Sequence, residues 1–178
     1  TVRNKDWNNA LTLYNHDIRI SEESFGLESN LGNELYLVQR YEEAKAHLER
    51  SVQLAPNWWG NWNNLGNVYL AKKDLTKAKS LYLRAIVNNE NFDVAYNNLA
   101  YVLLLNREPT EAKRLLENAI RKFPDKPRFF LLLAIAEYNA GNTGEALRLI
   151  EYARQAYPTP LTESVYSRML HNEPVILE

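Results

Sequence analysis

Residues of the same size recur every thirty-four positions along most of this 178-residue chain. The repeat is seen when the sequence is divided into four blocks that begin at Phe25, Trp59, Asp93 and Pro127. The recurring residues stand at position seven (Leu31, Leu65, Leu99, Leu133), position eight (Gly32, Gly66, Ala100, Ala134), position twenty (Ala44, Ala78, Ala112, Ala146) and position twenty-seven (Ser51, Ala85, Ala119, Ala153). This period is typical of a solenoid, in which each repeat buries its apolar face only against its neighbours. Because a solenoid presents a long surface, binding rather than catalysis is the function to expect.

Each block is predicted to form two amphipathic helices. In the second block, apolar residues three or four apart indicate a first helix from Trp59 to Lys72. Asp74 can then cap a second helix, whose small and apolar residues again follow the helical period. The chain is 46% hydrophobic, which is enough for a core along the whole stack. The sequence therefore predicts an all-α fold, an α-solenoid of antiparallel helix pairs.

The same spacing sets the expected boundaries of the repeats. Helix pairs are predicted at 25–58, 59–92, 93–126 and 127–160. Residues 1–24 match only the second half of a block, so we expect them to form the second helix of a partial repeat. Residues 161–178 are expected to form a capping helix and a tail, because the end of a solenoid needs a polar outer face.

The recurring positions resemble the tetratricopeptide repeat (TPR). The second block carries the residues of that motif most fully: Trp62, Leu65, Gly66, Tyr69, Ala78, Tyr82 and Ala85. Two residues depart from the motif, since Glu28 and Glu137 stand where a bulky residue is usual. The resemblance covers 25–160. It implies a right-handed α-solenoid, the TPR superhelix, whose first helices line a concave groove for a protein or an extended peptide.

The opening of the chain carries a second, shorter resemblance. Residues 1–7 and 11–14 are similar to the segment that joins a membrane-embedded glycosyltransferase to a C-terminal TPR tail. Bacterial protein-mannosyltransferase-like enzymes and the transmembrane TPR proteins of animals are built in this way. The chain also begins at Thr1 rather than at methionine, which indicates a fragment. The resemblance implies a membrane-anchored parent protein with this module on the extracytoplasmic face. Without such a parent, the expected location is the cytoplasm.

Asparagine side chains recur at the groove positions of the first three blocks. Position six, which faces the groove in TPR proteins, is asparagine in all three, and positions five and nine add further polar residues. The predicted binding residues are Asn30, Asn33, Asn63, Asn64, Asn67, Asn97, Asn98 and Tyr101. A primary amide has both an acceptor and donors, so such a row can pair with the backbone of an extended peptide. The row is similar in position and spacing to the asparagine ladder of O-GlcNAc transferase, and it stops at Leu132.

The asparagine row has a second interpretation. Asparagine is mildly unfavourable inside a helix, so its recurrence needs a physical reason. A solvated groove, or hydrogen bonds between adjacent repeats, would supply that reason as well as a peptide would. The row also disfavours a clamp for acidic tails, because its amides are neutral and Arg128 is the only basic residue at a matching position.

Other classes of function find no support in the sequence. A net charge of −1 offers no basic stripe for nucleic acid. The three histidines are far apart and cysteine is absent, so we expect no catalytic constellation, metal site or cofactor. No apolar run approaches the roughly 18 residues of a membrane span. The fragment is therefore expected not to be an enzyme.

Self-association is the competing function. A partial first repeat leaves an apolar face uncovered, which favours some partner. Trp58 and Trp59 either pack the turn between repeats or form an exposed contact patch, whereas Trp62 is expected in the core. In this alternative the first helix, the tryptophans or the apolar tail 174–177 pairs with a second copy, and the chain is a scaffold or homodimerisation module.

Overall fold

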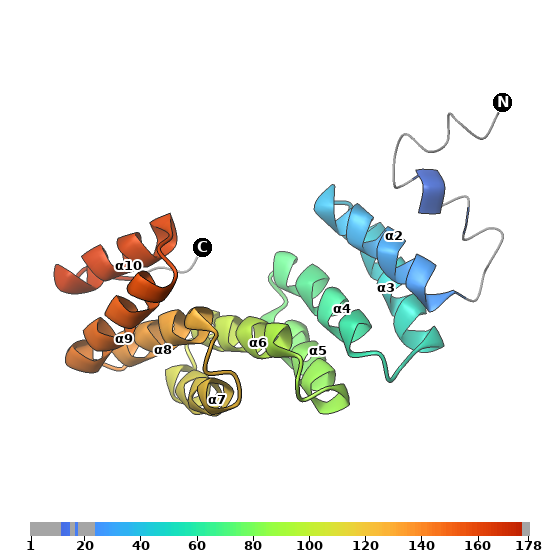
Figure 1. Ribbon diagram of the computed structural model, residues 1–178. Coiled ribbons are helices and arrows are strands. Elements are labelled where there is room, and N and C mark those ends of the chain that lie inside the picture. Colours follow the sequence, from blue (N-terminus) through green and yellow to red (C-terminus); the bar gives the residue numbers. More distant parts are fainter. Residues whose placement is uncertain (1–11, 15–16, 18–23, 176–178) are drawn as a thin grey trace. The chain divides into compact units, whose positions relative to one another are not determined.

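The computed structural model describes residues 12–14, 17 and 24–175, and over this range it contains helices and no strands. In chain order the helices are α2 (Phe25–Leu37), α3 (Tyr41–Leu54), α4 (Trp59–Ala71), α5 (Leu75–Asn88), α6 (Asp93–Leu105), α7 (Pro109–Lys122), α8 (Pro127–Asn139), α9 (Thr143–Ala156) and α10 (Pro160–Leu170) (Figure 1). The expected all-α fold of helix pairs is confirmed. Most of residues 1–24, which are expected to form the second helix of a partial repeat, lie outside the described residues, and so does the end of the apolar tail.

The chain divides into two compact units, Thr1–Phe92 and Asp93–Glu178. In the first unit α2 pairs with α3 and α4 pairs with α5, while α4 also contacts α3 and α2. In the second unit α6 pairs with α7 and α8 pairs with α9, and α8 also contacts α6 and α10. Each unit therefore places the first helices of successive repeats against one another.

The buried core of each unit follows the repeat. Position seven is a buried leucine in every block: Leu31, Leu65, Leu99 and Leu133. Position twenty-four of the block, which lies on the second helix, is fully buried in all four blocks: Leu48, Tyr82, Leu116 and Ile150. Position eight is small because the two helices of a pair approach closely there. A Cβ atom added to Gly66 would lie 2.6 Å from Cε1 of Tyr82.

The two departures from the motif are both buried and both paired. Oε2 of Glu28 lies 2.7 Å from Nδ1 of His47 on α3, which is hydrogen-bond distance. Glu137 lies 2.7 Å from Nζ of Lys113 and accepts a second hydrogen bond, also 2.7 Å, from the Asn142 amide. Burial alone would raise the pKa of Glu137, but the hydrogen bonds from Lys113 and Asn142 outweigh it and hold that pKa below its usual value.

The tryptophans differ in part from the expectation. Trp62 is only partly buried: its Nε1 donates to the Pro56 carbonyl at 2.6 Å, and the Arg84 guanidinium lies 4.7 Å from its ring. The long basic side chain on α5 thus covers a ring that was expected to be enclosed by apolar residues. Trp58 is 44% exposed and stacks on Trp59, with ring centroids 4.3 Å apart.

The helix ends follow the sequence closely. Asp74 caps α5 by accepting a hydrogen bond of 3.1 Å from the Lys77 backbone N–H. The last helix, α10, begins with a capping box in which the side chains and backbones of Thr159 and Thr162 bond reciprocally. Within the described ranges, no helix is long and apolar enough to cross a membrane.

Candidate functional site

The predicted binding residues all lie on the first helices of their repeats. In the N-terminal unit they are on α2 and α4, and in the C-terminal unit they are on α6. Because α2 contacts α4 and α6 contacts α8, residues at equivalent positions of neighbouring repeats come close together within each unit. The surroundings of each amide decide whether it is available to a ligand.

In the N-terminal unit several of the amides already have protein partners. Asn67 accepts a hydrogen bond of 2.8 Å from the hydroxyl of Tyr82, the residue at the centre of the α4–α5 contact. Asn64 donates to Oγ of Ser29 at 3.4 Å, which joins α4 to α2. Asn63 is only 4% exposed. Asn30, in contrast, is exposed. The amides of this unit therefore serve the packing of adjacent repeats at several points.

One asparagine outside the predicted row is more deeply buried than any in it. Asn61 is fully buried and donates from Nδ2 to the Ser51 carbonyl at 3.2 Å, while its Oδ1 has no hydrogen-bond partner among the described residues. Ser51 in turn donates from Oγ to the Phe25 carbonyl at 2.7 Å. The one sequence signal of this network is Ser51 itself, which replaces the alanine of position twenty-seven.

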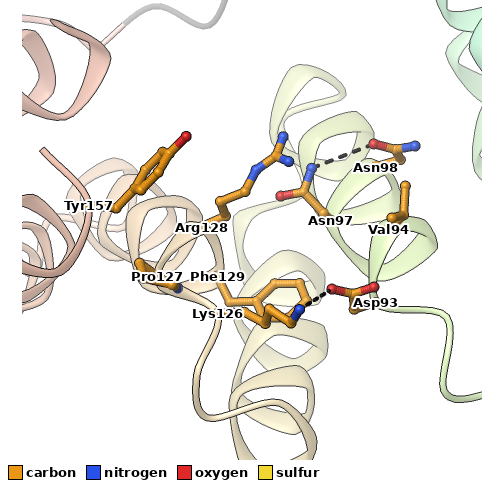
Figure 2. Close-up of a pocket in the computed structure, with 9 residues that line it drawn as sticks. All are labelled: Asp93, Val94, Asn97, Asn98, Lys126, Pro127, Arg128, Phe129 and Tyr157. Carbon is orange, nitrogen blue, oxygen red and sulfur yellow. Dashed lines mark hydrogen bonds and ion pairs between the residues drawn. The ribbon is translucent and has the colours of Figure 1, made fainter. Parts of the chain in front are cut away.

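In the C-terminal unit the predicted residues line a cavity. Asn97 and Asn98 are both half-buried on α6, and the Asn97 amide donates to Oδ1 of Asn98 at 3.5 Å. They form one wall of a cavity of about 290 Å³, as Figure 2 shows. Tyr101 lies one turn further along α6, and burial raises the pKa of its hydroxyl. This unit thus brings together two of the predicted amides at an open hollow.

The opposite wall of this cavity comes from α8 and from the residue that follows α9. Lys126 and Arg128 lie at the start of α8, and Tyr157 is the C-cap of α9. Nζ of Lys126 forms an ion pair of 3.2 Å with Asp93 on α6. Arg128 is exposed and makes no hydrogen bond or ion pair with the residues that the structure describes. In Figure 2 its side chain extends from α8 toward the side of the cavity where Asn97 lies.

A second hollow, of about 360 Å³, adjoins the first. The two share Pro127, Arg128 and Tyr157 in their walls. The rest of the second hollow is mainly apolar, with Leu131 and Leu161 among its lining residues. Sequence reasoning singled out Arg128 as the one basic groove residue but missed Tyr157 and Leu161, because they belong to no groove position of the four blocks.

The residues that line the two hollows supply hydrogen-bond donors and acceptors. Amides, a guanidinium and a phenol can donate and accept hydrogen bonds, and they stand beside an apolar hollow. Over the part of the chain that the structure describes, no three or more His, Cys, Asp or Glu side chains gather where they could hold a metal ion. Such a lining suits a peptide, with backbone amides to pair and apolar side chains to bury.

Comparison with known sequence families gives one consistent result. Three family models described as tetratricopeptide repeat match this chain, over residues 28–58, 60–91 and 97–159. Together they take in more than half of it. No protein in the curated set matches the chain.

Solved structures with the same fold are numerous. YrrB, whose structure is described as that of a TPR protein with an unusual peptide-binding site, is 20% identical, with a TM-score of 0.74 and coverage of 92% of this chain and 84% of YrrB. MamA is 20% identical, with a TM-score of 0.77 and coverage of 87% and 91% of the two chains. A thermophilic TPR protein of Thermus thermophilus is 21% identical, with a TM-score of 0.72 and coverage of 90% and 89%. At such low identity these likenesses show the fold. The matched repeats and the helix pairs agree, and the chain belongs to the tetratricopeptide-repeat family.

Proposed function

We propose that this chain is a non-catalytic module that binds a segment of another protein in extended conformation over its first helices. The observation that carries the proposal is the cavity of the C-terminal unit, where Asn97 and Asn98 of α6 face Arg128 of α8. The amides of the N-terminal unit add weaker support, because Asn64 and Asn67 are already bonded within the protein. The description of YrrB as having a peptide-binding site is in keeping with this use of the fold.

The physical basis is backbone pairing by side-chain amides. Each amide of the cavity has donors and an acceptor, so it can satisfy both the C=O and the N–H of an extended chain. Each such bond contributes about 0.5–1.5 kcal/mol net, which corresponds to roughly a 2- to 12-fold change in affinity. A few such bonds give weak binding with little dependence on sequence.

The test begins with peptides selected against the chain from a random library. Their affinities are then measured by fluorescence polarisation for the native chain and for Asn97→Ala and Asn98→Ala. Each variant is expected to bind about 2- to 12-fold more weakly, because each loses hydrogen bonds to the peptide backbone. Asn118→Ala is the matched control, since Asn118 is an exposed asparagine on the outer helix α7. If the α6 variants bind the peptides as tightly as the control does, the two amides do not contribute to peptide binding.

We also propose a parent protein in which this module recruits acceptor proteins for an attached membrane glycosyltransferase. This rests on the similarity of residues 1–7 and 11–14 to a joining segment, and most of those residues lie outside the described part of the chain. The coding sequence upstream of Thr1 tests it directly. A series of hydrophobic membrane spans encoded there supports this architecture, and an upstream coding sequence without such spans contradicts it.

Self-association is the second candidate function, and one observation favours it. Phe25 and Trp58 are both partly exposed, and their rings join Trp59 and Phe92 in a series of aromatic contacts along the N-terminal unit. Large exposed aromatic surface often marks a protein interface. Light scattering over a concentration series separates the two functions, because a strict monomer at all concentrations excludes a homodimer.

A further inference from the structure

The outer face of α5 carries an apolar pair that α3, α7 and α9 lack at the matching positions. Val87 is 85% exposed and Leu83, one turn before it, is 44% exposed. They stand at positions twenty-nine and twenty-five of the second block. The other three blocks have charged or polar residues at both positions: Glu49, Gln53, Glu117, Arg121, Glu151 and Gln155. Packing of a helix pair therefore does not require apolar residues there, and the pair on α5 needs another reason.

The apolar pair belongs to a straight row of exposed residues along α5. The row consists of Thr76, Ser80, Leu83 and Val87. Its members follow one another at spacings of four, three and four residues, so they lie on one side of the helix. This is the spacing of the seam along which two helices pack in a coiled coil. The opposite face of α5 is already used within the repeat, because Ala78, Tyr82 and Ala85 are fully buried.

Basic side chains flank this row. Lys77 and Arg84 are seven residues apart, so they lie on the same side of the row, and both are exposed. Nζ of Lys77 lies 5.0 Å from the Tyr69 ring, and the Arg84 guanidinium lies 4.7 Å from the Trp62 ring. These contacts hold the two side chains and leave their charges in place. The helix itself contains no Asp or Glu, and Asp74, which caps it, lies 3.4 Å from Nζ of Lys77.

Spacing and charge distinguish three occupants of the row. A second copy of α5 would bring Lys77 and Arg84 toward the same basic residues of its partner, and like charges disfavour that pairing. A lipid surface is bound by helices with a broad apolar face, whereas the outer face of α5 has a single row with two apolar side chains. A helix with acidic residues beside its own apolar row matches both the spacing and the charge.

We propose that the outer face of α5 docks an acidic amphipathic helix of a partner protein. The apolar residues of that helix pack against Leu83 and Val87, and its acidic residues lie beside Lys77 and Arg84. The docking surface is on a second helix, whereas the peptide site proposed above is on the first helices. The two proposals therefore stand or fall separately.

Two helical peptides test the proposal by NMR titration of the isotope-labelled chain. The first repeats Glu-Leu-Ala-Ala-Leu-Glu-Ala three times between capped ends, which places leucines at coiled-coil spacing with glutamates beside them. The second has lysine in place of every glutamate. The acidic peptide is expected to shift the backbone amide resonances of Ser80, Leu83 and Val87, and to bind about tenfold more tightly than the basic peptide. Equal affinities, or no shift on α5 with the acidic peptide, overturn the proposal.

Variants assign binding to the row and to its charges. Leu83→Gln combined with Val87→Gln is expected to weaken binding of the acidic peptide roughly tenfold, because it removes the apolar contact. This double variant should fold, since the other blocks have polar residues at both positions, and its circular-dichroism melting curve checks that. Arg84→Glu is expected to weaken the same peptide several fold, while Arg114→Glu, at an exposed arginine of α7, leaves its affinity unchanged. A double variant that binds as tightly as the native chain contradicts the proposal.

The other two occupants give distinct results, and either result overturns the proposal. Vesicles of phosphatidylcholine and phosphatidylserine that bind the native chain but not the double variant would show that the row takes a lipid surface. A dimer that light scattering detects for the native chain but not for the double variant would show that it takes a second copy. Neither result bears on the peptide site over α6, which is tested through Asn97 and Asn98.

Discussion

Glu28 and Glu137 stand at motif positions that other repeats fill with bulky side chains, and both are buried in the protein. Glu28 is 7% exposed and Glu137 is 4% exposed. Their burial is tolerated because each has a partner on a neighbouring helix: His47 for Glu28, and Lys113 for Glu137. A buried charge that lost such a partner would cost more than a neutral residue of the same size. The partner, rather than the motif position, therefore decides whether a residue of this kind fits.

Substitution at Glu137 is expected to change the pH dependence of stability. The folded-state pKa of Glu137 lies below its usual value, so this carboxylate stabilises the fold above about pH 4.3, and the contribution is lost as pH falls through the folded pKa. Glu137→Leu restores the apolar motif residue. We expect its free energy of unfolding at pH 7 to be at least equal to the native value, because the apolar side chain avoids the desolvation of a carboxylate and the part-exposed Lys113 can return to water. We also expect a flatter acid limb. Urea unfolding between pH 3 and pH 7 measures both.

The partner variant Lys113→Met gives the opposite outcome. It leaves Glu137 buried with only the Asn142 hydrogen bond, so stability at pH 7 is expected to fall, and the loss is expected to shrink as Glu137 becomes protonated. Unchanged acid limbs in both variants would show that the ion pair does not contribute to the pH dependence.

The asparagines show how far the candidate site could be predicted from the sequence. Spacing placed the amides on the first helices, which is where they are. It could not distinguish Asn67, bonded to Tyr82, from Asn97, which lines a cavity, because both are the same residue type at groove positions. The difference depends on side chains from other helices. Tyr157 enters the cavity from the end of α9, and no repeat position indicates that.

At the scale of the element, the first helix of every repeat ends in the same way. The residue at position fifteen follows each first helix with a positive φ: Gln39 at 61°, Lys73 at 61°, Arg107 at 59° and Gly141 at 87°. After α4, the Lys73 N–H donates to Leu70 O and the Asp74 N–H to Tyr69 O, both at 2.9 Å, which closes the helix end. Glycine, which adopts this conformation without strain, stands at this position only in the fourth repeat. The period predicted where the first helices end, but not that the backbone of three non-glycine residues adopts a left-handed conformation there.

Glycine at position fifteen is therefore expected to stabilise the chain. Lys73→Gly should raise the free energy of unfolding by about 0.5–1 kcal/mol, because a left-handed residue with a Cβ atom costs roughly 1–2 kcal/mol. Gly141→Ala should lower it by a similar amount for the same reason. Lys73→Ala is the control, since it removes the charge and keeps the Cβ atom. Urea unfolding that gives Lys73→Ala the same gain as Lys73→Gly would assign the effect to charge instead.

At the scale of the whole molecule, the thirty-four-residue period determines which parts of the chain depend on one another. In a fold of this family each repeat contacts only its neighbours, so stability is close to a sum of local terms. The position-eight glycine of the second repeat shows how local such a term is. Gly66 faces the fully buried ring of Tyr82, whose hydroxyl is held by Asn67. A methyl group added there has no room unless the ring moves.

Gly66→Ala is accordingly expected to destabilise the chain by about 1–3 kcal/mol through overpacking. Gly144→Ala is the matched control on α9, because an added Cβ atom there meets nothing within 4 Å, and it should instead stabilise by roughly 0.4–1 kcal/mol. Hydrogen exchange shows where the Gly66→Ala loss is felt. Protection should fall first in α4 and α5 and next in α2 and α3, which contact α4 and belong to the same compact unit, while α8 to α10 keep theirs. An equal loss of protection in α8 to α10 would mean that the chain unfolds as one cooperative block, and that the period does not govern its stability.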